Sequence, residues 1–396
     1  MEIELKLALP ASDPEGLVRS LTQITALEPC FSTPLARTTW TVRPRDGCAV
    51  EVALGIGHIL VGDTRAARCE LKLKLLEGKP DALFSLATQI ASAVATIPLG
   101  ISKAERGYAL ARNTLDAPRH AKPPTLTADL PEAVAAQRVL RESFSHFTTN
   151  LNGVVYCDDP ELVHQARVGW RRFKTSLKLF RKLTATHAPV PLQPLRPLLD
   201  ALGALRDLEV ASLETLPMLA NAYTDGNPRR QAHWRAMQQA LAQAADQQRD
   251  TLHNALCDPG VGVTLLALNQ WLEIELSLLA NAAVSDPKHT LQDWARQQIR
   301  HWHRQLKTAL ANAHDAASKH RARILAKRLR YGIEALRQLL PKRRARHWHL
   351  VASHLQSDMG SARDVLQALA IATHLKLAPS LLDFLRGVAV GRKHDN

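Results

Sequence analysis

Two stretches of the chain resemble each other closely and decide the fold: HQARVGWRRFK at residues 164–174 and HRARILAKRLR at residues 320–330. Both follow the pattern H-x-A-R-[V/I]-x-x-[R/K]-R-x-[K/R]. Each is followed by a second motif, LGALRDLEV at 202–210 and MGSARDVLQ at 359–367. From the histidine to the aspartate of the second motif the chain advances 43 residues in one copy and 44 in the other. Two motifs that recur at nearly one offset predict a duplicated helical unit.

The basic side chains of each copy are spaced three or four residues apart, which places them on one face of a helix. In the first copy these residues are His164, Arg167, Arg171, Lys174, Lys178 and Arg181. In the second copy they are His320, Arg323, Lys327 and Arg330. Arg172 and Arg328 flank the two rows. Like charges at this spacing repel each other, and a bound polyanion would turn that repulsion into attraction.

A simpler interpretation is that each row is a solvated helix face. A solvated face, however, requires neither a histidine nor the same basic order twice, so the repeat favours anion binding. The second motifs, Arg206-Asp207 and Arg363-Asp364, are compatible with two interpretations. Their arginines are either further anion ligands or partners in ion-paired contacts between helices.

The net charge lies almost entirely in the part of the chain that carries the repeat. The sequence of 396 residues has 51 Lys and Arg against 37 Asp and Glu, a net charge of +14. Residues 1–120 hold 14 basic and 13 acidic residues, so residues 121–396 hold 37 and 24. Such an excess favours a polyanionic partner: nucleic acid, polyphosphate or an anionic membrane. We expect its site in the second part.

The first part shows the alternation of apolar and polar residues that is typical of half-buried strands. It is clearest at residues 2–9 and 69–75, and shorter strands separated by glycine turns are expected at 37–43, 48–54 and 57–62. One helix is expected to begin at Ser12-Asp13-Pro14 and another to run from about Asp81 to Ala95. The pattern predicts a small α+β domain.

The second part predicts helices throughout, with clear starts at Asp158-Asp159-Pro160, Asp258-Pro259 and Pro131-Glu132. Between the two parts, the segment 109–131 contains four prolines, and we assign the linker to 116–129. The expected organisation is therefore an α+β domain over 1–115 and an all-α domain over 130–390. The latter would comprise two pseudo-symmetric units, about 130–284 and 285–390.

The doubled H-x-x-R-V-x-x-R-R-x-[K/R] and L-G-x-x-R-D segments resemble the CHAD family, the conserved histidine α-helical domain. This resemblance covers roughly residues 130–390. It implies two four-helix units around a basic channel that binds inorganic polyphosphate. The matching positions in the first copy are His164, Arg167, Arg171, Arg172, Lys174 and Arg206, with Lys178 continuing the row. In the second copy they are His320, Arg323, Lys327, Arg328, Arg330 and Arg363.

The first part resembles a shortened CYTH domain, the triphosphate tunnel fold, through Glu2-x-Glu4-x-Lys6 and the segment SKAERGY at 102–108. The resemblance implies an incomplete antiparallel sheet, with Glu2 and Glu4 as ligands of Mg²⁺ or Mn²⁺ if the domain is active. Glu51 and Glu70 are further candidates, or members of a solvated sheet face. Too few strands are present to close a tunnel, and lysines stand where the family repeats acidic residues. We therefore do not expect an enzyme.

The resulting hypothesis is a polyphosphate-binding protein that needs no cofactor for binding, located in the cytoplasm and associated with polyphosphate granules. The N-terminus lacks the apolar core of a secretory signal, and no unbroken apolar run reaches the length of a membrane span. The alternatives are a metal-dependent inorganic triphosphatase and a nucleic-acid-binding module. The last is less favoured because aromatic residues make up only 5% of the chain, too few for regular base stacking between the basic residues.

Overall fold

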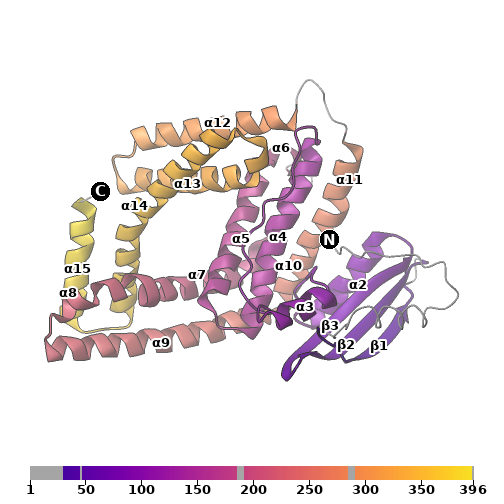
Figure 1. Ribbon diagram of the computed structural model, residues 1–396, viewed down its shortest axis with the longest axis horizontal. Coiled ribbons are helices and arrows are strands. Elements are labelled where there is room, and N and C mark those ends of the chain that lie inside the picture. Colours follow the sequence, from indigo (N-terminus) through magenta and orange to yellow (C-terminus); the bar gives the residue numbers. More distant parts are fainter. Residues whose placement is uncertain (1–29, 45–46, 185–190, 284–289, 395–396) are drawn as a thin grey trace, which may run out of the picture. The chain divides into compact units, whose positions relative to one another are not determined.

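The computed structural model describes residues 30–44, 47–184, 191–283 and 290–394, without the side chains at 316, 357–362 and 392–394 (Figure 1). The chain divides into two compact units. One comprises residues 1–85 and 99–117, and the other residues 86–98 and 118–396. The expected strand at 2–9, the helix start at Ser12 and the candidate metal ligands Glu2 and Glu4 lie outside the described residues.

The first unit contains a three-stranded antiparallel sheet in the order β1-β2-β3, formed by Leu35–Val42, Ala49–Val61 and Thr64–Glu77. Several residues of β2, among them Val50, Val52 and Ala53, are buried. This confirms strands in the predicted region. Two helices accompany the sheet: α2 (Pro80–Ala93), within which the division between the units falls, and α3 (Lys103–Ala111).

The predicted break between strands 48–54 and 57–62 is wrong, because β2 runs through both. Gly57 lies inside this strand and allows another segment to approach closely, rather than forming a turn. A Cβ atom at Gly57 would lie 2.2 Å from the carbonyl oxygen of Pro34, so no larger residue fits beside the neighbouring strand. The turn occurs instead at Gly62, whose φ of +52° is in the region that glycine favours.

The second unit is helical in all of its described residues apart from the connecting segments. Its longer helices are α4 (Glu132–Tyr156), α5 (Pro160–Leu179), α7 (Arg196–Glu209), α9 (Pro228–Leu256), α10 (Pro259–Gln270), α12 (Leu291–Ala311), α13 (Ala316–Ala335), α14 (Lys342–His374) and α15 (Pro379–His394). Shorter helices are α6 (Arg181–Thr184), α8 (Ala220–Thr224) and α11 (Leu276–Ala282). Two π-helical segments, η2 (Val210–Thr215) and η4 (Trp271–Glu275), follow α7 and α10.

The helix starts follow the predicted capping residues. The carboxylate of Asp159 accepts a hydrogen bond from the backbone nitrogen of Glu161 at 2.8 Å, with Pro160 in the first turn. Asp258 caps α10 in the same way, through the backbone nitrogen of Gly260 at 2.8 Å. These local contacts satisfy backbone donors that the first helical turn leaves free.

The buried side chains of this unit form three clusters. The first joins α4, α5, α7, α9 and α10, and the second joins α12, α13 and α14 with the first turns of α4. The third joins η2 and α9 with the ends of α14 and α15. The second and third clusters therefore each combine residues from before and after residue 284, the predicted boundary between the two repeat units. The two repeats share their cores, and the repeat boundary stays a prediction.

Side chains of the helical unit hydrogen-bond the backbone of the segment that precedes α4. The side chain of Asn150 bonds both the nitrogen and the carbonyl oxygen of Arg119, each at 2.9 Å. The side chain of Gln338 accepts from the nitrogen of Leu126 at 2.7 Å, and Leu126 itself is buried. The segment expected to be a linker therefore contributes packing to the helical unit.

Helices α4 and α5 approach so closely that Gly169 contacts the backbone of α4. A Cβ atom there would lie 2.7 Å from the nitrogen of Phe147. We expect Gly169→Ala to lower the free energy of unfolding by about 2 kcal/mol, because backbone atoms cannot move aside as a side chain can. Urea denaturation measures this. The control Gly387→Ala, a helical glycine with open space around it, should be neutral or stabilising. Equal effects of the two changes would contradict the close approach.

One described helical stretch, Pro259–Ala282, is long and apolar enough to cross a membrane by length and composition alone. Val261, Leu265, Leu268 and Leu272 of this stretch belong to the first core cluster. Core helices of soluble proteins pass the same test, so the stretch is weak evidence for a membrane span.

Candidate anion-binding site

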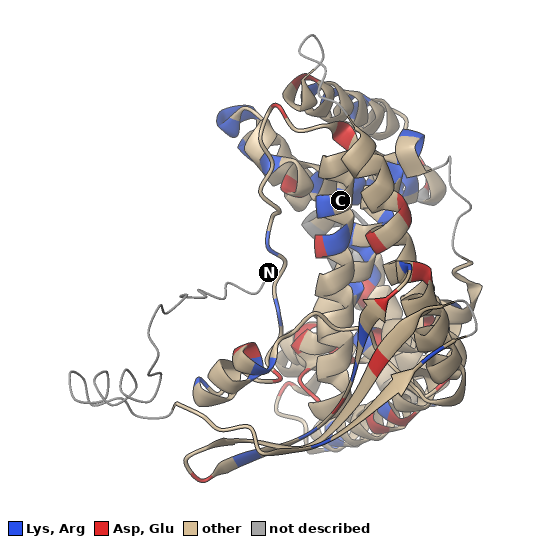
Figure 2. Cartoon of the chain, turned by 90° about the vertical axis from the view of Figure 1, so that its right-hand side faces the viewer, with Lys and Arg blue, Asp and Glu red and all other residues tan. Residues whose placement is uncertain are grey.

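The four helices that carry the repeated motifs contact one another in a closed circuit. The stripe of the first copy lies on α5 except for Arg181, which begins α6, and the stripe of the second lies on α13. The Arg-Asp motifs lie on α7 and α14. Helix α5 contacts both α7 and α13, α13 contacts α14, and α14 contacts α7. Figure 1 shows these helices around one region of the helical unit, and Figure 2 shows Lys and Arg on several helices of this unit.

Arg167 of α5 lies directly against α7. Its Nη1 atom would be 2.8 Å from a Cβ atom at Gly203, so the absence of a side chain at Gly203 makes room for the guanidinium. Burial, together with repulsion from Arg171, Arg206 and Arg363 and against the opposing effect of Asp207, lowers the pKa of Arg167 to about 10. Arginines from three helices therefore lie within electrostatic reach of one another.

Lys327 of α13 is surrounded by cations from three helices. Burial, together with repulsion from Arg171, Arg323, Arg363 and Arg330, lowers its pKa to about 7. Burial also lowers the pKa of Arg323, with Arg363 as the next cause. The two copies thus bring their stripes together, α5 through Arg171 and α13 through Arg323 and Lys327.

Four of these cations have no ion pair among the described side chains: Arg167, Arg171, Arg323 and Lys327. The Nε atom of Arg323 is buried and has no hydrogen-bond partner there. Asp207 and Asp364 act on Arg167 and Arg323 only at longer range. Half-buried cations that lack counter-charges are costly, because each loses hydration without compensation. We name Arg167, Arg171, Arg323, Lys327 and Arg363 the cationic cluster.

Other predicted site residues have partners within the protein. Arg172 of α5 donates to Oε2 of Glu334 on α13 at 2.5 Å, and its side chain is only 13% exposed. The other oxygen of Glu334 pairs with Arg330 at 3.4 Å and with His349 of α14 at 3.1 Å. Glu334 therefore links three helices of the circuit: Arg172 holds α5 to α13, and His349 connects α14. The pair of Arg330 with Glu334 lies within α13 itself.

We expect Glu334→Gln to lower the free energy of unfolding by about 2–4 kcal/mol, since Arg172 would keep a half-buried charge without its carboxylate. Chemical denaturation checks this value. The matched control is Asp383→Asn, which removes an exposed carboxylate paired with Arg386 at 2.7 Å and should cost less than about 1 kcal/mol. If both variants lose the same small amount, Glu334 is not a structural link.

Arg206 and Arg328 also have interaction partners within the protein. Nη2 of Arg206 donates to Oε1 of Glu214 at 2.6 Å, on the π-helical segment η2 that directly continues α7. The guanidinium of Arg328 lies 4.2 Å from the ring centroid of Trp302, a cation–π contact. Burial lowers the pKa of Arg328, as does Arg181.

The remaining predicted residues lie at the margins of the cluster. Burial and then Arg206 lower the pKa of His164, so a neutral imidazole that donates one hydrogen bond is favoured near neutral pH. Burial and then Lys178 lower the pKa of Lys174. Lys178 and His320 are exposed.

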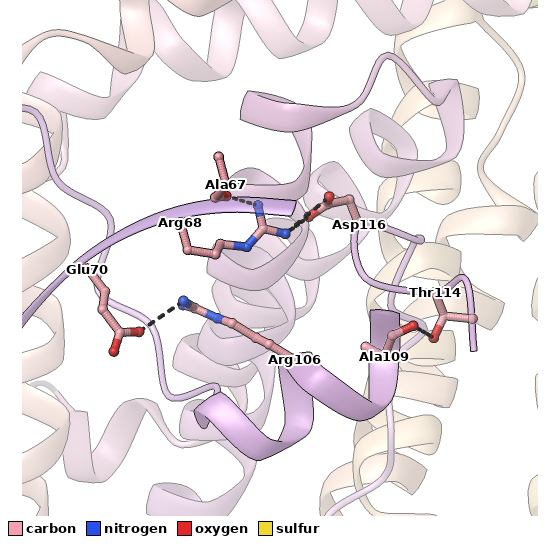
Figure 3. A network of polar contacts seen from close by, with 7 residues as sticks. All are labelled: Ala67, Arg68, Glu70, Arg106, Ala109, Thr114 and Asp116. Carbon is pink, nitrogen blue, oxygen red and sulfur yellow. Dashed lines mark hydrogen bonds and ion pairs between the residues drawn. The ribbon is translucent and has the colours of Figure 1, made fainter. Parts of the chain in front are cut away.

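In the first unit, the two described candidate metal ligands are paired with cations. Glu70 pairs through one oxygen with Arg106 at 3.1 Å (Figure 3). Its other oxygen pairs with Lys103 at 3.1 Å. Glu51 pairs with Arg37 at 3.1 Å. Within the described residues no group of three or more His, Cys, Asp or Glu side chains could hold a metal ion. These contacts favour a structural role for both glutamates, with Glu70 fastening α3 to β3.

Sequence reasoning missed Glu334, Glu214 and Gln367, the last of which donates to Asp207 at 3.3 Å between α14 and α7. Only the pairing of Arg330 with Glu334 had a local signal, the four-residue spacing of an acid and a base on one helix.

Comparison with known proteins supports the helical part of this description. The family model of the CHAD domain matches residues 138–373. The crystal structure of the CHAD domain from the plant Ricinus communis is 28% identical, with a TM-score of 0.60, and the match covers 71% of this chain and 92% of that one. PptA from Streptomyces chartreusis is 16% identical, with a TM-score of 0.42, over 67% of this chain and 94% of its own. The family match begins at residue 138, so the resemblance of residues 1–115 to a CYTH domain stays a prediction.

Proposed function

This chain belongs to the CHAD domain family, and we propose that its helical unit binds inorganic polyphosphate through the cationic cluster. The observation that carries the proposal is the convergence of Arg167 and Arg171 with Arg323, Lys327 and Arg363 without ion-paired carboxylates for the first four. A polymer that carries a charge on every phosphate compensates several cations at once, and each guanidinium can donate two hydrogen bonds to phosphate oxygens.

The paired residues have a different role in this proposal. Arg172 positions α5 against α13 through Glu334, so it sets the spacing between the two stripes rather than binds phosphate directly. Arg330 pairs with Glu334 within α13 and is likewise occupied. His164, Lys174, Lys178 and His320 extend the binding surface from the cluster along the two helices. Such a surface binds through many weak contacts, so affinity should rise with polymer length and fall with salt. A protein of this kind would associate with polyphosphate granules in the cytoplasm.

Nucleic acid is the competing ligand, because its phosphate backbone also suits a basic surface. The test is a competition experiment with the full chain at roughly physiological salt. Labelled long-chain polyphosphate is displaced by unlabelled polyphosphate, tripolyphosphate, single-stranded DNA or duplex DNA at matched total charge. We expect polyphosphate to compete at least about 100-fold better than either DNA, since a sugar separates successive phosphates along each DNA strand and the sugars and bases add bulk that the cluster does not need. Equal competition by DNA would overturn the proposal.

A triphosphatase activity of the first unit finds no support in the described residues, because Glu51 and Glu70 are occupied by arginine and lysine side chains. An assay for Mg²⁺- or Mn²⁺-dependent release of phosphate from tripolyphosphate, with Glu2→Ala and Glu4→Ala as controls, would test the part of the chain that the structure does not describe.

A further inference from the structure

The π-helical segment η2 places an acidic side chain at one end of the binding surface. Glu214 is ion-paired with Arg206 at 2.6 Å, and it also acts electrostatically on His164 of α5 and on Asp364 of α14. It is therefore bordered by three of the four motif helices. The Glu214 side chain is 57% exposed, whereas that of Arg206 is 15% exposed, so the carboxylate is the member of the pair that can leave.

Arg206 would stay in place without Glu214. A second carboxylate, Glu209 at the end of α7, lies 3.9 Å from its Nη1 atom. Glu209 is almost completely buried, and neither of its oxygens has a hydrogen-bond partner among the described residues. Burial raises the pKa of Glu209 to about 7 against the opposing effects of Arg206 and Arg249, so near neutral pH part of this group is a carboxylate. In its charged form it gives Arg206 a second partner when Glu214 moves away.

Arg206 lies toward the His164 end of the stripe on α5. It acts on both His164 and Arg167, whereas the four cations that act on Lys327 do not include it. From Arg171 to His164 the helix advances seven residues, or about 10 Å. A short phosphate chain held by Arg171, Arg323 and Lys327 need not reach Arg206, but a long chain that follows the stripe must meet it.

We propose that Glu214 is a built-in competing anion: it occupies Arg206 in the free protein and is displaced by long polyphosphate chains but not by short ones. This inference rests on the proposed function and adds a residue that sets the preference for chain length. The displacement costs the same for every chain that reaches Arg206, while longer chains gain more contacts elsewhere. Interruptions of α-helices by π-helical turns are frequent at functional sites, and η2 is such an interruption.

The test compares Glu214→Gln with the full-length parent protein by calorimetric titration with long-chain polyphosphate and with tripolyphosphate. Glu214→Gln should bind the long chain about three- to tenfold more tightly, as expected for removal of a partly exposed competing ion pair. Its affinity for tripolyphosphate should change less than about twofold, because screening over about 8 Å at physiological salt weakens the influence of Glu214 on the cluster.

The matched control is Asp200→Asn, which removes the same charge from an exposed pair with Arg196 on α7 and should leave both affinities unchanged. In an Arg206→Gln background the gain from Glu214→Gln should disappear, since the two residues act as a pair. The inference is overturned if Glu214→Gln binds the long chain no better than the parent, or if its gain persists without Arg206. Failure of parent and variant alike to bind any polyphosphate overturns the proposed function itself, and this inference with it.

Discussion

Reversing four charges of the cationic cluster is expected to lower the affinity for long-chain polyphosphate at least about 100-fold. The variant carries Arg167→Glu, Arg171→Glu, Arg323→Glu and Lys327→Glu. Each change replaces a charge-assisted hydrogen bond by repulsion, and a single such bond contributes about 1.5–3 kcal/mol. The loss is measured by fluorescence anisotropy or calorimetry at fixed salt.

The control variant reverses four exposed arginines outside the cluster: Arg229, Arg235, Arg343 and Arg346. It has the same net charge as the cluster variant, so it weakens the long-range attraction between the protein and the polyanion equally. We expect its affinity for long-chain polyphosphate to fall less than about tenfold. A milder set with glutamine at the four cluster positions guards against misfolding caused by four new carboxylates near Asp207 and Asp364. If the control loses as much as the cluster variant, the stripes are a generic basic surface.

The affinity for polyphosphate is expected to fall as the pH rises above 7, by up to about tenfold per pH unit. The reason is Lys327, whose pKa of about 7 in the free protein reflects burial and the cations around it. These cations are Arg171 from α5, Arg323 and Arg330 from α13, and Arg363 from α14. A bound polyanion favours the charged amine and raises its pKa, so binding above pH 7 must take up a proton.

Titrations between pH 6.5 and 8.5, in two buffers that differ in ionisation enthalpy, measure both the slope and the proton uptake. Lys327→Arg is the decisive variant, because a guanidinium stays charged over this range. It should bind as well as the parent at pH 6.5, bind better at pH 8.5 and take up fewer protons. An unchanged slope in Lys327→Arg would assign the pH dependence to other groups.

The lowered pKa of Lys327 also makes the stability of the folded protein depend on pH. The pKa of Lys327 in the folded protein lies below its ordinary value of 10.5, so between about pH 7 and 10.5 the unfolded chain holds more protons. The contribution of Lys327 to stability therefore increases with pH in this window, and it is unfavourable at neutral pH. The proposed anion-binding site therefore lowers the stability of the free protein at neutral pH.

Much of the helical architecture follows from local sequence patterns. The caps at Asp159 and Asp258 and the three- and four-residue spacing of the stripes concern neighbours within one or two turns. Such neighbours interact in the same way wherever the helix packs, so the sequence alone determined the starts of these two helices and the existence of two cationic stripes.

Tertiary structure decided which of these cations remain without counter-charges. The helix pattern places Arg172 beside the row that contains Arg171, but it does not reveal that Arg172 meets Glu334, which is 162 residues away along the chain. Likewise Gly57 looks like a turn residue until Pro34 of the neighbouring chain segment is placed beside it. Contacts between distant segments depend on how whole helices and strands pack, and that packing balances contributions from many residues. The sequence by itself therefore determined the repeated stripes, and only the packing of α5, α7, α13 and α14 decided which charges are left for an anion.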